Sequence, residues 1–216
     1  MSQKKEFFTT PIYYVNDVPH IGHAYTSIAV DFLARFSRLN GNEVRFLTGT
    51  DEHGLKIQKA AEIASISPID LCNKNSIIFR ELTKKLNLSN DDFIRTTETR
   101  HKNGASHLWK LLFENGDIYL DEYTGWYSVN DETFYNEKDL IKQENGSFKT
   151  ITGGPVEWIK EESYFFKLSK YQERLLDYYD KHPDFILPET KRNEVINFVK
   201  GGLRDLSVSR TSFNWG

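Results

Sequence analysis

Two histidines separated by two residues are the first side chains in the sequence whose types and spacing could do chemistry. His20 and His23 flank Gly22 in the string from Pro19 to His23. At this spacing, both imidazoles lie on one side of a first helical turn. Gly22 has no side chain, so a flat nucleobase could approach the backbone closely. The string predicts a nucleoside triphosphate site, whereas the alternative is one helix-capping histidine and one surface histidine.

The elements around this string favour the first interpretation. A β-prone run at 7–10 ends at Pro11, and a helical pattern begins near Gly22 and ends at Gly41. Apolar residues recur every three or four positions on one face of this helix, namely Ile28, Phe32, Phe36 and Leu39. Ligands of open parallel sheets bind where a strand passes into a helix, and a helix N-terminus offers unpaired backbone N–H groups to phosphate.

The pattern that follows predicts the fold class. Strands and helices alternate at 44–47, 57–63, 68–86, 93–94 and 98–113. Such alternation is typical of βαβ units, so we expect an α/β fold with a parallel, Rossmann-like sheet. After Gly116 the pattern becomes aromatic and β-branched up to Pro155, with helices at 170–179 and 190–199 and a strand at 205–210. This indicates a small α+β insertion.

We therefore expect three parts. Residues 1–115 form the first half of the sheet domain, 116–204 form the inserted domain, and 205–216 begin the return to the sheet. The net charge of -3 gives no overall basic field, although basic surface could still be local. With Cys72 as the single cysteine, a disulfide framework and a cysteine-based zinc site are excluded. No membrane span or presequence is evident, which predicts a soluble, cytoplasmic protein without a membrane partner.

Two strings carry a resemblance to a known family. Residues 10–23 resemble the first signature of class I aminoacyl-tRNA synthetases, whose core is His-Ile-Gly-His. Residues 47–54, Leu-Thr-Gly-Thr-Asp-Glu-His-Gly, are similar to the string that methionyl enzymes carry after their second strand. The segments 155–158, 164–167 and 201–206 also look like the family's inserted domain and its return to the sheet. The resemblance covers essentially the whole chain.

This resemblance implies a two-step reaction. Methionine and ATP, the latter with Mg²⁺, would give methionyl-adenylate and pyrophosphate, and the methionyl group would then pass to tRNA(Met). The methionine carboxylate is the nucleophile, so catalysis lies in positioning and in stabilising charge. By the family's motif, His20 and His23 would be the catalytic residues and would contact the ATP phosphates, while Gly22 would lie under the adenine.

The same resemblance implies a methionine pocket. The Ile12 carbonyl and the Asp51 carboxylate would bind the substrate ammonium, and Tyr14 would cover the thioether. From the residues alone, an acidic residue at a strand end is more often a helix cap than a ligand-binding group, so Asp51 could be a cap. His53 beside it could suggest a metal, but without a second ligand cluster a cap or local hydrogen bond is favoured.

The first departure from the family concerns zinc. Many methionyl enzymes carry a zinc knuckle in the insertion, but here Ser128 and Asp131 stand at the first ligand pair, and Lys149 and Thr152 at the second. These four groups make no tetrahedral zinc site. We predict that no structural zinc binds and that the knuckle is held by core aromatic residues, namely Trp126, Tyr127, Phe134 and Trp158.

The second departure is the absence of the family's Lys-Met-Ser-Lys-Ser signature, of the second half of the sheet and of the anticodon-binding domain. The sequence thus resembles the N-terminal part of a synthetase. It would be a poor catalyst alone, and a complementing C-terminal part would supply the rest. One alternative is a non-catalytic protein of this fold that binds nucleotide or a partner. Another is a pantothenate or nicotinate nucleotidyl enzyme of the same superfamily, which would lack the 50–54 string and the long insertion.

Overall fold

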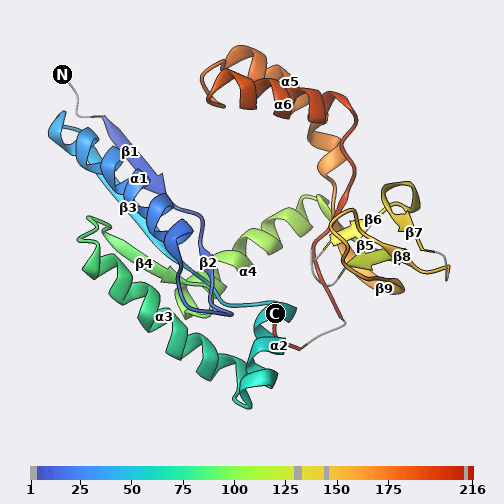
Figure 1. The fold of residues 1–216 in the computed structure, drawn as a ribbon. Helices are drawn as coiled ribbons and strands as arrows, with labels where there is room; N and C mark the ends of the chain where they lie inside the picture. The colour runs from blue at the N-terminus through green and yellow to red at the C-terminus, as the bar shows by residue number, and fades with distance from the viewer. Residues whose placement is uncertain (1–3, 129–132, 144–145, 212–213) are drawn as a thin grey trace. The chain divides into compact units, whose positions relative to one another are not determined.

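The computed structural model describes residues 4–128, 133–143, 146–211 and 214–216. The chain divides into two compact units, Met1–His107 with Phe213–Gly216, and Leu108–Ser212. Each unit is described by itself (Figure 1). The sequence-based division at 115 and 204 stays a prediction.

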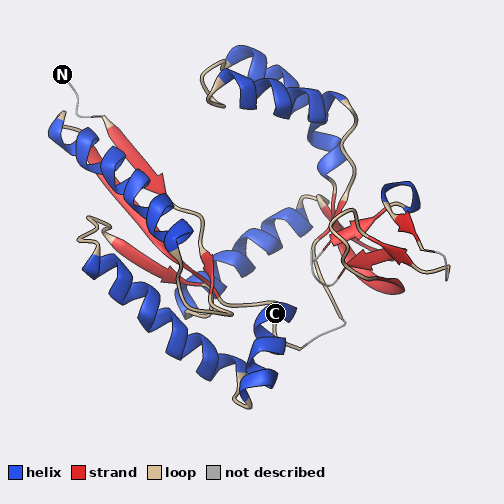
Figure 2. Ribbon diagram, viewed as in Figure 1, coloured by secondary structure: helices blue, strands red, loops and turns tan. Residues whose placement is uncertain are grey.

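A parallel sheet forms the framework of the first unit (Figure 2). Its strands are β1 (Lys5–Thr9), β2 (Tyr13–Tyr14), β3 (Glu43–Asp51) and β4 (Asp92–Arg95). Leu47 pairs with both Thr9 and Asp92, so β1 and β4 lie on opposite sides of β3. Thr50 likewise pairs with Tyr13 on β2 and with β4, so β2 continues along the side of β1. The predicted parallel, Rossmann-like sheet is confirmed.

The helices of this unit follow the predicted alternation. They are α1 (Ile21–Leu39), α2 (Leu55–Ala64), α3 (Pro68–Lys85) and the first part of α4 (Thr99–Glu114), which passes into the second unit at Leu108. The crossovers from β1 to β3 and from β3 to β4 run in the same direction across the sheet. Right-handed connections therefore place α1 and α3 on the same face. The rings of His23 on α1 and Phe79 on α3 agree, with centroids 5.2 Å apart.

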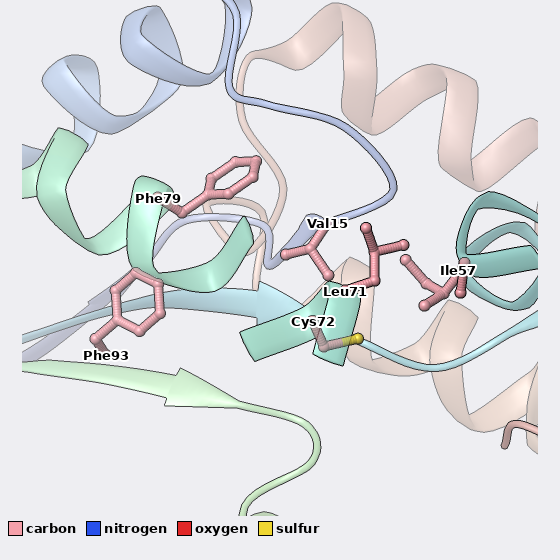
Figure 3. Close-up of a cluster of buried hydrophobic side chains, with 7 residues drawn as sticks. Val15, Ile57, Leu71, Cys72, Phe79 and Phe93 are labelled. Atoms are coloured by element: carbon pink, nitrogen blue, oxygen red, sulfur yellow. The ribbon is translucent and has the colours of Figure 1, made fainter. Parts of the chain in front are cut away.

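A continuous apolar cluster lies beneath the carboxyl ends of the strands. It consists of Val15, Ile57, Ala61, Leu71, Cys72, Phe79 and Phe93 (Figure 3). Tyr13, Ala60 and Trp215 pack against it while only partly buried. The cluster joins α2, α3 and β4 to the segment that follows β2, so it supports the loops at this edge.

The apolar stripe of α1 lies in solvent in this chain. Ile28, Phe32, Phe36 and Leu39 are 49%, 66%, 56% and 86% exposed. The residues that α1 buries are instead small or polar, namely Ser27, Asp31, Ala34 and Ser37. Asp31 accepts hydrogen bonds from the backbone N–H and hydroxyl of Ser89, both at 2.6 Å. Hydrogen bonds therefore anchor the inner face of this helix, and its apolar face has no cover among the described residues.

The second unit contains the end of α4, antiparallel sheets and further helices. Its long strands β5 (Ile118–Ser128) and β9 (Val156–Phe166) pair along their full length. The other elements are β6 (Thr133–Tyr135), η1 (Glu137–Asp139), β7 (Ile141–Lys142), β8 (Phe148–Lys149), η2 (Leu168–Tyr171), α5 (Gln172–Lys181), α6 (Glu189–Lys200) and β10 (Leu206–Ser207). The predicted β-rich character after Gly116 and the two predicted helices are confirmed. The strand predicted at 205–210 is shorter, and it pairs with β9. No helix in the described ranges has the length and apolarity to cross a membrane.

The predicted aromatic core of the knuckle is only partly right. Tyr127 is 6% exposed, but Trp158 is 56% exposed and covers one side of Trp126, with ring centroids 5.2 Å apart. Trp158 is thus not a core residue, because its strand has one face open to solvent. The Phe134 side chain and Asp131 lie outside the part of the chain that is described.

Hydrogen bonds to Thr150 stabilise the turn at which Lys149 and Thr152 replace the family's second pair of zinc ligands. Thr150 is 1% exposed, and its hydroxyl accepts a hydrogen bond from the Gly154 N–H at 3.0 Å. It also pairs with the Thr152 hydroxyl at 2.8 Å. The Thr150 carbonyl accepts from the Gly153 N–H at 2.9 Å.

Candidate functional site

His20 and His23 cap the first helix reciprocally. His20 is the N-cap residue of α1, and its Nδ1 accepts a hydrogen bond from the Gly22 N–H at 3.1 Å. Nδ1 of His23 accepts from the His20 N–H at 3.0 Å. This is a capping box built from two histidines. The prediction that these residues lie at the start of the first helix is confirmed. The capping histidine of the alternative is also found, but the second histidine takes part in the same cap.

This geometry determines which atoms face a ligand. Because both Nδ1 atoms accept hydrogen bonds, each neutral ring carries its proton on Nε2. Burial of the ring, and then the charge of His20, lower the pKa of His23 below its usual value of 6.5. A neutral His23 at pH 7 is thus an N–H donor. The sequence predicted that N–H groups at the N-terminus of this helix would be open to phosphate. The Gly22 N–H is instead bonded to His20, so at this position the imidazole, and not the backbone, is the donor available to a phosphate.

Gly22 has a local structural role. A Cβ at this position would lie 2.9 Å from Cε1 of His20, so a larger residue would displace the ring. The capping arrangement therefore depends on the glycine.

Sequence reasoning missed the residues that support His23. The Tyr13 ring contacts His23 edge-on, with centroids 4.8 Å apart, and its hydroxyl pairs with that of Ser27 at 2.9 Å. Phe79 stacks on Tyr13 at 5.9 Å. A signal was available in the consecutive tyrosines, because neighbouring residues of a strand point to opposite faces. Tyr13 therefore points to α1, leaving Tyr14 for the other side.

The proposed methionine residues come together at the ends of the same strands. Tyr14 on β2 is the register partner of Asp51, the last residue of β3. Ile12, just before β2, and Tyr14 are 38% and 41% exposed, and Asp51 is half-buried. The helix-cap alternative for Asp51 is wrong for α2, because the N-cap of that helix is Gly54 and no side chain caps it.

His53 and Glu52 have partners that lie far away in the sequence. The His53 ring lies 5.4 Å from that of Trp215, and Glu52 is fully buried beside Arg95. No local pattern could reveal the contact with Trp215, since the separation exceeds any helical or strand period. Within the described ranges, no group of three or more His, Cys, Asp or Glu side chains could hold a metal ion.

Comparison with known proteins assigns the family. The family model described as tRNA synthetases class I (M) matches residues 6–144 and 142–216. The chain belongs to this family. Among curated class I synthetases, it is 56% identical to the methionine–tRNA ligase of Mesorhizobium japonicum over 216 residues, 100% of this chain and 42% of that protein. It is 58% identical to the methionine–tRNA ligase of Rickettsia bellii over 210 residues, 97% of this chain and 40% of that protein.

Solved synthetase structures agree with this assignment. The Mycobacterium tuberculosis methionyl-tRNA synthetase in complex with methionyl-adenylate superimposes with a TM-score of 0.93 at 52% identity, covering 99% of this chain and 42% of that one. The predicted membership of the methionyl class I synthetases is confirmed. The chain spans about two fifths of the length of the relatives it matches.

Proposed function

We propose that this chain forms the ATP- and methionine-binding part of a methionine–tRNA ligase. One observation carries the proposal: the reciprocally capped pair His20 and His23 and the register pair Tyr14 and Asp51 lie at the same carboxyl edge of one parallel sheet. In open α/β sheets this edge is where ligands bind. The methionyl-adenylate held by the mycobacterial relative is the product expected of such a site.

In the first step, a carboxylate oxygen of methionine attacks the α-phosphorus of ATP. A bond forms between that oxygen and phosphorus, the bond from phosphorus to the bridging oxygen breaks, and pyrophosphate leaves with the electron pair. The Nε2–H groups of His20 and His23 donate to phosphate oxygens whose charge changes in the transition state. Their Nδ1 atoms are already bonded to the backbone, so little reorganisation is needed. Mg²⁺ accompanies ATP as part of this substrate.

Methionine is held at the opposite end of the reacting bond. Asp51, with the Ile12 carbonyl, binds the ammonium group, and the Tyr14 ring covers the thioether. In the second step, a terminal hydroxyl of tRNA(Met) attacks the methionyl carbonyl carbon and AMP leaves. The predicted cytoplasmic location fits this reaction, because ribosomes consume the product.

No structural zinc takes part in the proposed function. Ser128, Lys149 and Thr152 offer neither thiolate nor imidazole. The hydrogen bonds of Thr150 stabilise the turn that a metal would otherwise hold.

The remaining part of the synthetase is the proposed partner of α1. Relatives are more than twice the length of this chain. Among the described residues no strand pairs with the outer edge of β1, and the apolar face of α1 (Ile28, Phe32, Phe36 and Leu39) is exposed. A polypeptide corresponding to the rest of the relatives' length would cover both. This C-terminal part would also supply the lysine signature for the pyrophosphate.

ATP–pyrophosphate exchange by the complete synthetase containing this chain tests the proposal. Asp51→Ala removes a charge-assisted contact worth roughly 1.5–3 kcal/mol, so the methionine KM should rise about ten- to a hundredfold. His20→Ala should mainly lower kcat, because its partner is charge that develops in the transition state. Lack of methionine-dependent exchange in the parent protein would favour a non-catalytic binding protein. An unchanged methionine KM in Asp51→Ala would overturn the site assignment.

A further inference from the structure

The carboxylate next to Asp51 is buried and fully engaged. Glu52 is 0% exposed, and Arg95 donates to both of its oxygens, from Nε to Oε1 at 2.7 Å and from Nη2 to Oε2 at 2.9 Å. The hydroxyls of Thr50 and Thr97 donate to the same carboxylate. A buried charge is costly unless it is paired and hydrogen-bonded. The Glu52 side chain is therefore held in one position.

The backbone of Glu52 is held as well. Its N–H donates to the Thr96 hydroxyl at 2.8 Å, and its carbonyl accepts from Nε1 of Trp215 at 2.6 Å. The Cys72 thiol contacts the same carbonyl at 3.4 Å. These contacts fix the peptide units that follow Asp51, at the point where β3 ends.

Trp215 closes the turn between β3 and α2 from both sides. Besides its bond to the Glu52 carbonyl, its own carbonyl accepts from the Gly54 N–H at 2.9 Å. Its indole lies against His53 and packs on the apolar cluster of Figure 3. One residue thus bonds the peptide units before and after His53, although 163 positions separate it from Glu52.

We propose that Trp215, acting through the buried Glu52, is a positioning residue that sets the place of the Asp51 carboxylate in the methionine site. This rests on the proposed function. Asp51 ends its strand, so its carboxylate is placed by the peptide units on its C-terminal side as well as by β3. Binding groups must be held to within about 0.5 Å, and residues behind them supply that accuracy. The indole N–H is the side-chain group of Trp215 that bonds the turn next to Asp51, and the Trp215 carbonyl bonds the turn through the backbone.

Trp215→Phe in the complete synthetase separates this role from packing, because phenylalanine keeps a ring and loses the N–H donor. The methionine KM in ATP–pyrophosphate exchange should rise about three- to tenfold. The KM for ATP should stay within twofold, because no contact described for the histidines of α1 reaches this turn. Methionine binding measured by calorimetry should weaken by the same factor.

Phe46→Leu is the matched control for stability. Phe46 is 0% exposed on β3 and makes no contact with the Glu52 network among the hydrogen bonds described. This variant should lower Tm and leave the methionine KM unchanged. If it raises the methionine KM as much as Trp215→Phe does, the effect is one of general stability and the proposal is wrong.

A double-mutant cycle with Asp51→Ala decides the mechanism. If Trp215 acts through Asp51, then Trp215→Phe should have no further effect on the methionine KM once Asp51 is alanine. Additive effects would contradict the proposal. An effect of Asp51→Ala with none of Trp215→Phe would also overturn it while leaving the proposed function intact. No effect of Asp51→Ala itself would instead overturn the methionine-site assignment in the proposed function.

Discussion

Tyr14 and Asp51 are partners across two parallel strands, each at the last position of its strand. Neighbouring strands lie about 4.8 Å apart. An aromatic ring and a carboxylate at the ends of neighbouring strands suit a small amphipathic ligand with a soft apolar end and an ammonium group. Lys56 lies over the Tyr14 ring, with its Nζ 5.5 Å from the centroid, so the ring also has support from α2.

Tyr14→Ala should weaken methionine binding more than ATP binding. Loss of the ring removes apolar and sulfur–aromatic contact worth about 1–2 kcal/mol, so the methionine KM should rise roughly five- to thirtyfold. Tyr14→Phe should have little effect, since the ring remains. Tyr25→Ala, at a tyrosine of α1 that is 76% exposed, is the matched control. Equal effects at Tyr14 and Tyr25 would contradict a specific role for Tyr14.

His23 should titrate below its usual pKa of 6.5, since burial and the charge of His20 disfavour the imidazolium. Because the unfolded chain binds this proton more readily, the contribution of His23 to stability is complete above about pH 6.5. It is lost as the pH falls through the folded pKa. Histidine ¹H–¹⁵N spectra should show the Nε2–H tautomer. In urea unfolding, His23→Gln should lose less stability than the parent between pH 7.5 and 5.5. An equal loss in both proteins would show that His23 does not contribute.

The exposed face of α1 should control association with the rest of the synthetase. When this chain and a separately produced C-terminal part are mixed, they should copurify and restore ATP–pyrophosphate exchange. Phe32→Asp places a charge in the proposed apolar interface and should weaken association at least tenfold. Ile77→Asp on α3, where isoleucine is 61% exposed, is the control. Full association of Phe32→Asp would show that this face is not the docking surface.

The knuckle should be stable without metal. Thr150→Val leaves the Gly154 N–H without its buried acceptor and should cost about 1–2 kcal/mol, a fall in Tm of several degrees. Thr152→Val, at an exposed position, should cost less. A chelator should leave Tm unchanged, and elemental analysis should find no zinc. A stoichiometric zinc content, or a Tm that falls on chelation, would refute this prediction.

The secondary structure of the first unit was largely predictable because its signals are local. The 3.6-residue period indicated α1, and Ser67 followed by Pro68 marks the start of α3, where the Ser67 side chain caps the helix. Alternating strands and helices imply parallel pairing through right-handed crossovers. The position of the histidines at the first helix followed from the same local pattern.

Burial was less predictable, since it depends on what covers each face. The apolar stripe with Phe32 and Phe36 is typical of a core face but is exposed. The polar Asp31 is buried, and Ser89 donates hydrogen bonds to its carboxylate. Trp158 was predicted to be a core residue because it is a large aromatic residue of the knuckle, and its side chain lies half in solvent. A period shows which residues share a face, and only the neighbouring elements decide whether that face is covered.

The sequence by itself determined the α/β class, the family and four candidate ligand-binding residues, namely His20, His23, Tyr14 and Asp51. Each of these residues lies in a short sequence motif that can be recognised without knowing the tertiary structure. Tertiary structure alone decided that Asp51 ends a strand instead of capping a helix, and that Tyr13 supports His23. It also brought Trp215 to the Glu52 carbonyl. Contacts between residues so far apart in the chain are set by strand register and core packing, which no local pattern records.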